Sequence, residues 1–592
     1  MNNRADAPNM RDDNQSGHIV ENKMDNIDSS HALIVQDAEG GFQSIFHKIR
    51  HAYYRTIWRT PLHRARLSGK APLKLLAAPI DPFSGDEVRG SALRAGKMQF
   101  RGMDLDMRDA NLSAPVIPPD FTDYLHRMDW LRDLSACANR GQIIAIAEKY
   151  CAAWLEENGG NVKNEAWRGD NIVWRFINMA HHAPLILSSR NSDYRRDILN
   201  HFADMADEMD KIAPMIKHDY VRVVIWCGVL AAGLLLPDGK ERLTIGQDAL
   251  KKALDKAIYN DGGLASRSPA QLIECCKLLI LTANIYTARG MMRPQFLDQH
   301  IAKIIPAILC LRHSDGGLGA WQGSGHGTTN LVEQILSASP VTARPQRQSK
   351  TWGYQRISAG KSVLIIDAGP PPLAKNAWVS CASTLAIEFS FAAQRIFINC
   401  GGGALASHAL PADLARGLRT TAAHSTLCVE NVNSTAILPE GKLGKGVNIV
   451  DLERRDEDQL TRLTASHDGY VRNFGFIHQR SITLRSDGLE MRGSDILLPA
   501  EKAKPKAETQ YEIRFHLGPN IDLYSGEEKG SILLRLRDGS SWLFQASQCE
   551  VNVEDSLWVN EEGEPAETQQ IILTHKSEQG GSSTNWSLQF IG

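Results

Sequence analysis

The chain has 592 residues, of which 43% are hydrophobic and 23% are charged, and its formal net charge is −2 at pH 7. This composition is typical of a globular protein, and the length allows several domains. Because positive and negative charges nearly balance, no overall basic field is available to bind nucleic acid or an anionic lipid surface. We therefore expect no nucleic-acid partner, while local arginines remain available for an acidic polymer.

The N-terminal residues are polar and rich in Asn and Asp, and they contain no apolar segment of the kind that a secretory signal requires. Residues 1–40 are therefore predicted to form a disordered polar tail. The longest apolar run, residues 223–236, is too short to cross a membrane and suits a buried helix. The ten cysteines include no CxxC pair, which favours a reducing compartment over a disulfide framework.

Helical periodicity dominates residues 41–338, which are predicted to form one helical domain. Ile198, Phe202, Met205 and Met209 recur at steps of four, three and four, so they form an apolar stripe along one helix. The tetrapeptide DGGL occurs at 261–264 and again at 315–318, each time between helical segments. Repeated helix–loop–helix units predict stacked α-hairpins arranged as a solenoid or toroid.

The apolar period changes from helical to alternating after residues 339–350, which are polar and are predicted to be a linker. Ile532 and Leu534 alternate before an Asp538-Gly539 turn, and Trp542 continues the alternation after it. Many short segments of this kind follow one another without a helical pattern between them. Residues 351–592 are therefore predicted to form a large antiparallel β-sandwich.

His424 lies in RTTAAHSTLCVEN (419–431), between small and hydroxyl residues and just before an apolar alternation. It is either a proton-transfer or metal-binding group at the start of a strand, or a histidine bonded to the backbone near a sheet edge. Taken alone, the residues favour the second interpretation. The histidine pairs 181/182, 313/326, 408/424 and 467/478 lack the usual metal-ligand spacing, so nothing requires a zinc site.

Two further segments carry residues suited to a sugar polymer. Arg267 lies in DGGLASRSPAQL (261–272), before a helix that Ser268 is expected to cap. It suits either a bidentate clamp on a carboxylate or a solvated position beside a capped turn, and the residues leave both open. Trp167 and Trp174, seven residues apart, and Arg175 suit a sugar groove, although such a stripe is more often core.

Taken together, several segments resemble the heparinase II/III-like family of polysaccharide lyases. They run in the family's order over about residues 90–592: FTDYLHRMDWLRDL (121–134), WRGDNIVWRFIN (167–178), DGGLASRSP (261–269), TLAIEFSFAAQRIFINCGG (384–402), LRTTAAHSTL (418–427) and IRFHLGP (513–519). The resemblance implies an N-terminal (α/α) toroid followed by a C-terminal antiparallel β-sandwich. It also implies β-elimination of an acidic polysaccharide.

That chemistry requires a group that neutralises the uronate carboxylate, a base that removes the C5 proton and an acid that protonates the leaving oxygen. Against the family pattern, Ala270-Gln271 stands where a tyrosine base is usual, and Arg222 stands near the position of a histidine. Asn376, Ser380 and Ser383 stand in a stretch that usually contains histidine and aspartate. The histidine of the AHST motif, His424, matches a metal ligand of zinc-bearing members.

The leading expectation is therefore a lyase that cleaves a uronic-acid-containing glycan. The alternative is a catalytically degenerate member that binds an envelope or intracellular glycan without cleaving it. We expect that no cofactor is required. The metal considered is zinc, with His424 as its possible ligand. Absence of a signal favours the cytoplasm and the resemblance favours the periplasm, and no membrane span is expected. The catalytic candidates are His424, Arg267, Tyr354 and Arg222, and the substrate-binding candidates are Asp261, Trp167, Arg175, Trp321, Asn399 and Arg419.

Overall fold

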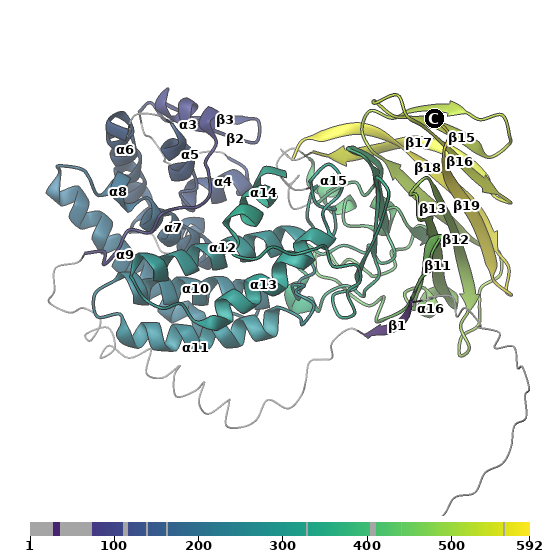
Figure 1. The fold of residues 1–592 in the computed structure, drawn as a ribbon, viewed down its shortest axis with the longest axis horizontal. Helices are drawn as coiled ribbons and strands as arrows, with labels where there is room; N and C mark the ends of the chain where they lie inside the picture. The colour runs from purple at the N-terminus through teal and green to yellow at the C-terminus, as the bar shows by residue number, and fades with distance from the viewer. Residues whose placement is uncertain are drawn as a thin grey trace, which may run out of the picture.

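The computed structural model describes residues 28–35, 74–109, 117–137, 140–160, 164–326, 329–402, 410–439, 441–560 and 563–592. A helical unit and a β unit lie side by side (Figure 1). The main helices of the first unit are α3 (Glu87–Arg94), α4 (Pro119–His126), α5 (Trp130–Ala136), α6 (Arg140–Asn158), α7 (Gly169–His181), α8 (Ala183–Ile186), α9 (Ser192–Ile212), α10 (Asp219–Leu235), α11 (Lys240–Ala257), α12 (Pro269–Ala288), α13 (Gln295–Cys310) and α14 (Thr329–Ala338). A short hairpin, β2 (Lys97–Phe100) and β3 (Met103–Asp106), accompanies them.

The predicted apolar stripe of α9 and the predicted start of α12 are both present in the structure. The Asn191 side chain caps α9 by accepting hydrogen bonds from the backbone N–H groups of Asp193 and Tyr194. The predicted stripe of α9 is buried along its length, and it joins the core of the helical unit. Ser268 caps α12 by accepting from the Gln271 N–H, with Pro269 at the first helical position, as expected.

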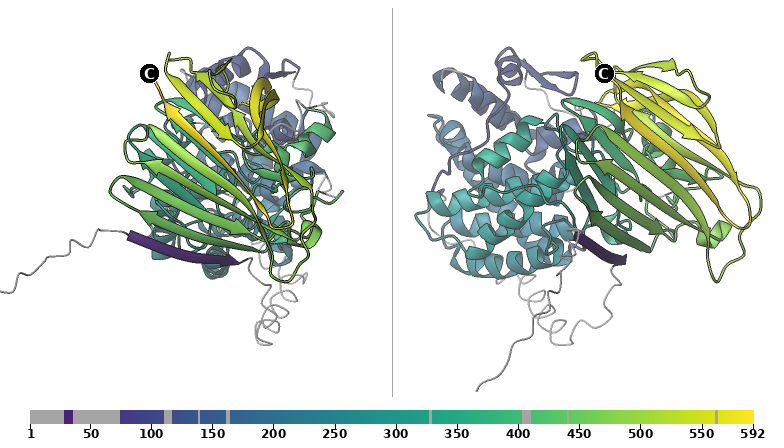
Figure 2. Two further views of the ribbon diagram at one scale, coloured as in Figure 1. Left: turned by 90° about the vertical axis from the view of Figure 1, so that its right-hand side faces the viewer. Right: turned by 45° about the vertical axis from the view of Figure 1, so that its right-hand side comes forward.

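The β unit is a sandwich of two antiparallel sheets, also as expected (Figure 2). One sheet has the order β1-β9-β10-β11-β12-β19-β16-β15-β14, and the other has the order β17-β18-β13-β7-β6-β5-β4, with β8 paired to β13. The strands of the first are β1 (Asp28–Val35), β9 (Ile449–Asp456), β10 (Leu460–His467), β11 (Phe476–Arg485), β12 (Glu490–Pro499), β14 (Asp522–Ser525), β15 (Ser531–Arg535), β16 (Ser541–Ser547) and β19 (Ser582–Phe590). Those of the second are β4 (Tyr354–Ala359), β5 (Ser362–Asp367), β6 (Ile387–Phe391), β7 (Gln394–Ile398), β8 (Leu427–Val429), β13 (Thr509–Leu517), β17 (Glu550–Val559) and β18 (Pro565–Ser577).

The two units share apolar packing and ion pairs. Trp352 and Tyr354, at the start of the β unit, are fully buried within the core of the helical unit. Beside them, the Asp315 carboxylate pairs with Arg395 at 2.6 Å, and His313 Nε2 lies 3.1 Å from the Glu388 carboxylate. Because Glu388 is fully buried, its pKa is raised to about 7 despite the nearby Arg395. These contacts fix the helical unit against the outer face of the second sheet.

The structure corrects one expectation about the N-terminal tail. Residues 28–35, predicted to be disordered, form strand β1 at the edge of the first sheet. The rest of the predicted tail lies outside the described residues. The prediction missed the strand because a single eight-residue edge strand carries little periodic signal beside a long polar context. In the described part of the chain, no helix is both long enough and apolar enough to cross a membrane.

Candidate functional site

A cluster of charged side chains forms where α10 begins against the β unit. Asp219, the first residue of α10, is only 3% exposed. Its backbone N–H donates to Asn376 Oδ1 at 2.9 Å, and its Oδ2 accepts from Asn376 Nδ2 at 3.0 Å. Asn376 belongs to the loop of residues 374–383, between β5 and β6. This reciprocal pair therefore joins the helical unit to that loop.

Three cations surround the Asp219 carboxylate. Lys375 Nζ lies 3.4 Å from Oδ2, Lys256 Nζ lies 3.6 Å from Oδ1, and Arg222 Nη1 lies 4.0 Å from Oδ1. Burial lowers the pKa of Lys256, and the neighbouring charges of Lys375 and Arg222 lower it further, although Asp219 acts in the opposite direction. We call these four residues and Asn376 the Asp219 cluster. Its three cations face one carboxylate, so a second anion would relieve their mutual repulsion.

An exposed aromatic ring borders the Asp219 cluster. Trp378, two residues after Asn376, is 73% exposed, and its ring centroid lies 6.4 Å from that of His218 in an edge-on arrangement. His218 precedes α10, and its Nδ1 accepts a hydrogen bond from the Val221 N–H. In the neutral imidazole the proton therefore lies on Nε2, so His218 presents a donor rather than a base. The cluster thus combines cations, a hydrogen-bond donor and a flat apolar ring.

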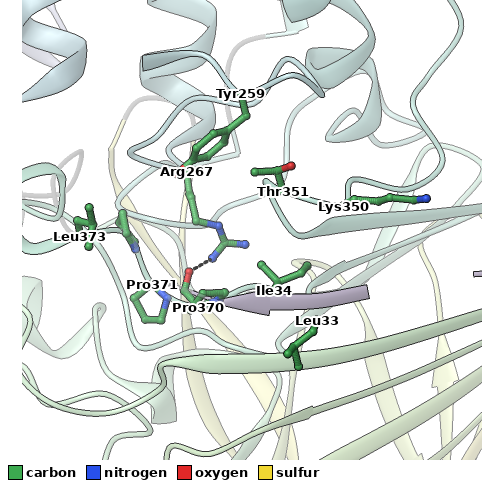
Figure 3. Close-up of a pocket in the computed structure, with 10 residues that line it drawn as sticks. Leu33, Ile34, Tyr259, Arg267, Lys350, Thr351, Pro370, Pro371 and Leu373 are labelled. Atoms are coloured by element: carbon green, nitrogen blue, oxygen red, sulfur yellow. Dashed lines mark hydrogen bonds between the residues drawn. The ribbon is translucent and has the colours of Figure 1, made fainter. Parts of the chain in front are cut away.

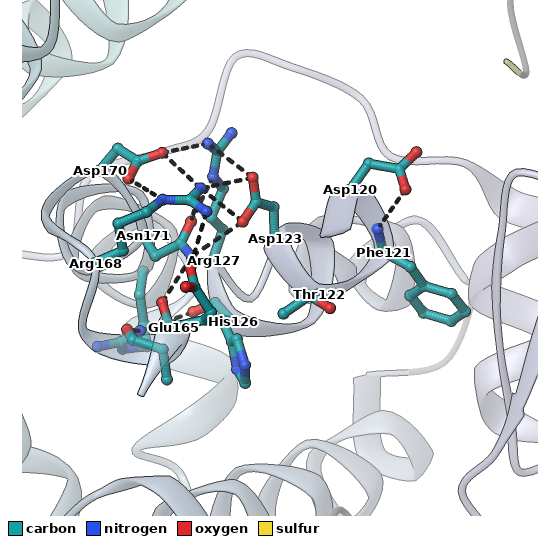
Figure 4. A network of polar contacts seen from close by, with 12 residues as sticks. Asp120, Phe121, Thr122, Asp123, His126, Arg127, Glu165, Arg168, Asp170 and Asn171 are labelled. Atoms are coloured by element: carbon teal, nitrogen blue, oxygen red, sulfur yellow. Dashed lines mark hydrogen bonds and ion pairs between the residues drawn. The ribbon is translucent and has the colours of Figure 1, made fainter. Parts of the chain in front are cut away.

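A second polar network joins the end of α4 to the start of α7 (Figure 4). Tyr220 donates to Glu274 at 2.8 Å, and Glu274 lies 3.4 Å from Arg127. Acidic groups outnumber the cations there; the network consists of Arg127, Arg168, Asp123, Glu165, Asp170 and Asn171 together with Glu274. Its cations are already neutralised, and the pKa of Asp170 is lowered by them despite burial. An acidic ligand is therefore favoured at the Asp219 cluster and disfavoured here.

Arg267 and Tyr354 lie together inside the interface between the two units, where both side chains are buried. Arg267 Nη2 binds the Asp367 carboxylate at 2.6 Å, and its other donors go to the backbone carbonyls of Trp352, Gly369 and Pro370. Tyr354 is fully buried below the guanidinium and donates to the Arg267 carbonyl oxygen. Burial and Asp367 raise the pKa of Tyr354 well above 10, which makes it a poor base.

His424 is also buried and bonded to the backbone. Its Nδ1 lies 2.7 Å from the Thr420 carbonyl oxygen, and burial lowers its pKa to about 4. Within the described residues, no group of three or more His, Cys, Asp and Glu side chains is placed to hold a metal ion. Of the four catalytic candidates, Arg267 and Tyr354 are in contact and His424 shares the electrostatic influence of Asp367, while Arg222 belongs to the Asp219 cluster.

The six substrate-binding candidates hold the fold together in this conformation. Asp261 accepts hydrogen bonds from the backbone of Thr351 and Trp352, which fixes the start of the β unit. The Arg175 guanidinium is buried between Trp154 and Trp167, and its pKa falls to about 9. The remaining three are buried as well: Trp321, Asn399, whose amide donates to Glu388, and Arg419, whose Nε donates to the Ser380 carbonyl.

The sequence reasoning missed most of the Asp219 cluster. Asp219, Lys256 and Lys375 carry no motif and come together only through folding. Asn376 was noted as a replacement for a usual histidine or aspartate, and that replacement is the residue that binds Asp219. The exposure of Trp378 is known only from the structure, and no local pattern in NAWVSCAS (376–383) predicts it.

A toroid of helices joined to a β-sandwich defines a chain with the fold of the toroid-type polysaccharide lyases. Heparinase III shares this fold at a TM-score of 0.68 and 11% identity, over 94% of this chain and 92% of that one. A heparan sulfate lyase from Pedobacter heparinus does so at a TM-score of 0.56 and 15% identity, over 92% and 88%. At this level of identity the likeness concerns the fold alone.

The C-terminal part of the chain carries the family match. Residues 341–587 match the family model described as heparinase II/III-like, C-terminal, the family that the sequence segments resemble. The chain is also similar to FtsZ-localized protein C of Caulobacter vibrioides, with 24% identity over 541 residues that cover 89% of this chain and 92% of the relative.

Proposed function

We propose that this protein binds an acidic glycan at the Asp219 cluster and does not cleave it. The observation that carries the proposal is the set of three cations around one buried carboxylate, next to the exposed ring of Trp378. A uronate carboxylate supplies the missing negative charge, and the apolar face of a sugar ring suits an exposed indole. The neighbouring acidic network keeps such a ligand on the side of Trp378.

The state of the candidate bases supports binding without cleavage. Proton abstraction requires a group that is within reach of the substrate and able to accept a proton near neutral pH. Tyr354 is buried with its hydroxyl donating to a backbone carbonyl, and His424 is bonded to Thr420. His218, the histidine closest to Trp378 by ring contact, has its acceptor nitrogen engaged by the backbone. Cations and donors for binding are therefore present at the cluster, whereas Tyr354, His424 and His218 are not available as bases.

Replacement of Trp378 or Lys375 by alanine is expected to weaken glycan binding about tenfold each, which corresponds to about 1.4 kcal/mol. Trp378 loses the stacking surface, and Lys375 loses one of three attracting charges. Titration calorimetry with heparan sulfate and with polygalacturonate measures the change, with dextran as the neutral comparison. Binding to the acidic polymers should also weaken as salt is added, because part of it is electrostatic.

Two matched variants keep this test specific. Lys252→Ala removes an exposed lysine from the same helix as Lys256, and Tyr524→Ala removes a half-exposed ring from the distant β14. Neither should change affinity. Equal loss in all four variants would contradict the assignment of the site. Ultraviolet absorbance of an unsaturated uronate product, formed by the wild-type protein, would show instead that the leading expectation of a lyase was right.

A second function is favoured by the similarity to a relative whose name describes it as FtsZ-localized. Because that similarity spans the helical and β units alike, we propose that this chain also associates with FtsZ, and therefore acts in the cytoplasm. Purified protein should co-sediment with GTP-assembled FtsZ polymers and remain in the supernatant with unassembled FtsZ. Trp378→Ala should leave this association unchanged if the two activities use separate surfaces. Equal amounts in the pellet with and without polymers would overturn the proposal.

A further inference from the structure

Strand β1 occupies the edge of the nine-stranded sheet as a separate piece of chain. It pairs antiparallel with β9 over its whole length, from Asp28 opposite Asp456 to Val35 opposite Ile449. The next described residue along the chain is residue 74, so residues 36–73 connect the strand to the helical unit. In both views of Figure 2 the strand lies at the margin of the sheet.

Among the described side chains of β1, those of residues 30–34, few hold the strand in place. Ile34 is 5% exposed and joins the core between the sheets, whereas Leu33 is 59% exposed. The polar contacts described for these side chains are Ser30 Oγ to Gln348 at 2.6 Å and the pair of His31 with Asp451, both of whose side chains are at least half exposed. The strand is therefore held mainly by its backbone hydrogen bonds to β9. The β1 strand of a second copy could form the same hydrogen bonds.

The β1 sequence also lacks two of the residues that usually prevent an edge strand from pairing with another molecule. Natural edge strands carry lysine, proline or bulges that block a second chain, and DSSHALIV contains neither lysine nor proline. A connection of the length of residues 36–73 can span up to on the order of 100 Å when extended. An identical strand of a second copy therefore meets the same partners on β9 without any change in the rest of the fold.

We propose that β1 is an exchangeable strand, and that two copies of this chain associate by placing β1 of each on β9 of the other. The β9 edge is then an interaction surface whose occupant is a second copy. Its complementarity is set by the observed register: the buried Ile34 fits the core beside Val450, and His31 pairs with Asp451. The proposal is independent of glycan binding.

Exchange would also make each copy complete a cavity of the other. A cavity of about 330 Å³ lies where β1 meets the linker and the helical unit (Figure 3). Leu33 and Ile34 form one wall, Tyr259 and Arg267 come from the helical unit, and residues 370–373 close another side. In an exchanged pair, the wall formed by Leu33 and Ile34 belongs to the second copy.

Cysteine cross-linking distinguishes exchange from pairing within one chain. Leu33 and Asp451 are register partners with exposed side chains, so Leu33→Cys and Asp451→Cys are made in separate full-length chains and mixed under mild oxidation. Exchange predicts a covalent dimer of twice the chain mass that increases with protein concentration. It also predicts that deletion of residues 1–35 removes the dimer seen by light scattering while the circular dichroism spectrum is kept.

Two controls decide between the outcomes. A chain with both Leu33→Cys and Asp451→Cys reports whether the strand occupies β9 at all, in either arrangement. A mixture of Thr464→Cys and Ser481→Cys, register partners inside the same sheet, should give no intermolecular product because β10 and β11 cannot exchange alone. If the Leu33/Asp451 mixture stays monomeric, the proposal is overturned. This holds whether the double variant forms a link within one chain or none.

Discussion

Replacement of Asp495 by alanine is expected to lower the free energy of unfolding by about 3–5 kcal/mol, because it leaves a buried charge without its partner. Asp495 is fully buried between the sheets, where it accepts hydrogen bonds from Arg480 at 2.7 and 3.1 Å and from the Trp586 ring at 2.9 Å. His478 Nε2 lies 2.8 Å from the same carboxylate. Urea denaturation monitored by tryptophan fluorescence measures the loss.

An exposed ion pair of the same sheet provides the comparison. Glu453→Ala breaks the pair of Glu453 with Arg455, and it should cost less than about 1 kcal/mol because solvent already screens both groups. Lowering the pH should likewise remove more stability from the buried Asp495 network than from the exposed pair. The pKa of Asp495 is lowered in the folded protein, so the stability it contributes is present above its unfolded pKa of about 4 and is lost as pH falls below it. Equal losses in both variants would contradict the buried network.

Arg267→Ala is expected to lower the free energy of unfolding by a similar 3–5 kcal/mol, and its effect should appear at the contact between the two units. The side chain comes from the helical unit, whereas Asp367, Gly369 and Pro370 belong to the β unit. Its removal leaves Asp367 buried with only Ser383 and Gln322 as side-chain partners. Hydrogen exchange should therefore speed up on both sides of the contact, around residues 352–354 and 367–370.

A double-mutant cycle identifies the source of this effect. Asp367→Asn removes the negative charge with little change in volume, so the two substitutions should be strongly non-additive. Arg267→Lys keeps the positive charge and loses most of the directed donors, so it should fall between wild type and alanine. Additive losses would show that the guanidinium acts through packing on Tyr354 and not through the ion pair.

The architecture was accessible from the sequence because it depends on periodicity. The α9 stripe and the change to alternation after residue 350 are local patterns, and burial enforces both. Arg267 shows the limit of the same reasoning. The residue was expected to face either a substrate carboxylate or solvent, and it binds a carboxylate of its own chain that lies 100 positions further along. Local sequence specified the chemistry of the group but not its partner.

His424 shows a related limit. Taken alone, the residues favoured a histidine bonded to the backbone, and the structure has that bond, to Thr420. The family resemblance pointed to His424 as a metal ligand. Among the described residues, no group of three or more His, Cys, Asp and Glu side chains is placed to hold a metal ion with it. The Asp219 cluster escaped prediction because its members come from α10, α11 and a β-unit loop, and no spacing rule relates them.

The loop of residues 374–383 has a thermodynamic consequence. It binds Asp219 through Asn376, Arg419 through the Ser380 carbonyl and Asp367 through Ser383. Any ligand that orders Lys375 and Trp378 therefore orders the same segment that connects the two units. Ligand binding and the contact between the units are then thermodynamically linked. Any change that stabilises the contact raises the affinity for the ligand. Saturation with the ligand in turn raises the melting temperature of both units together.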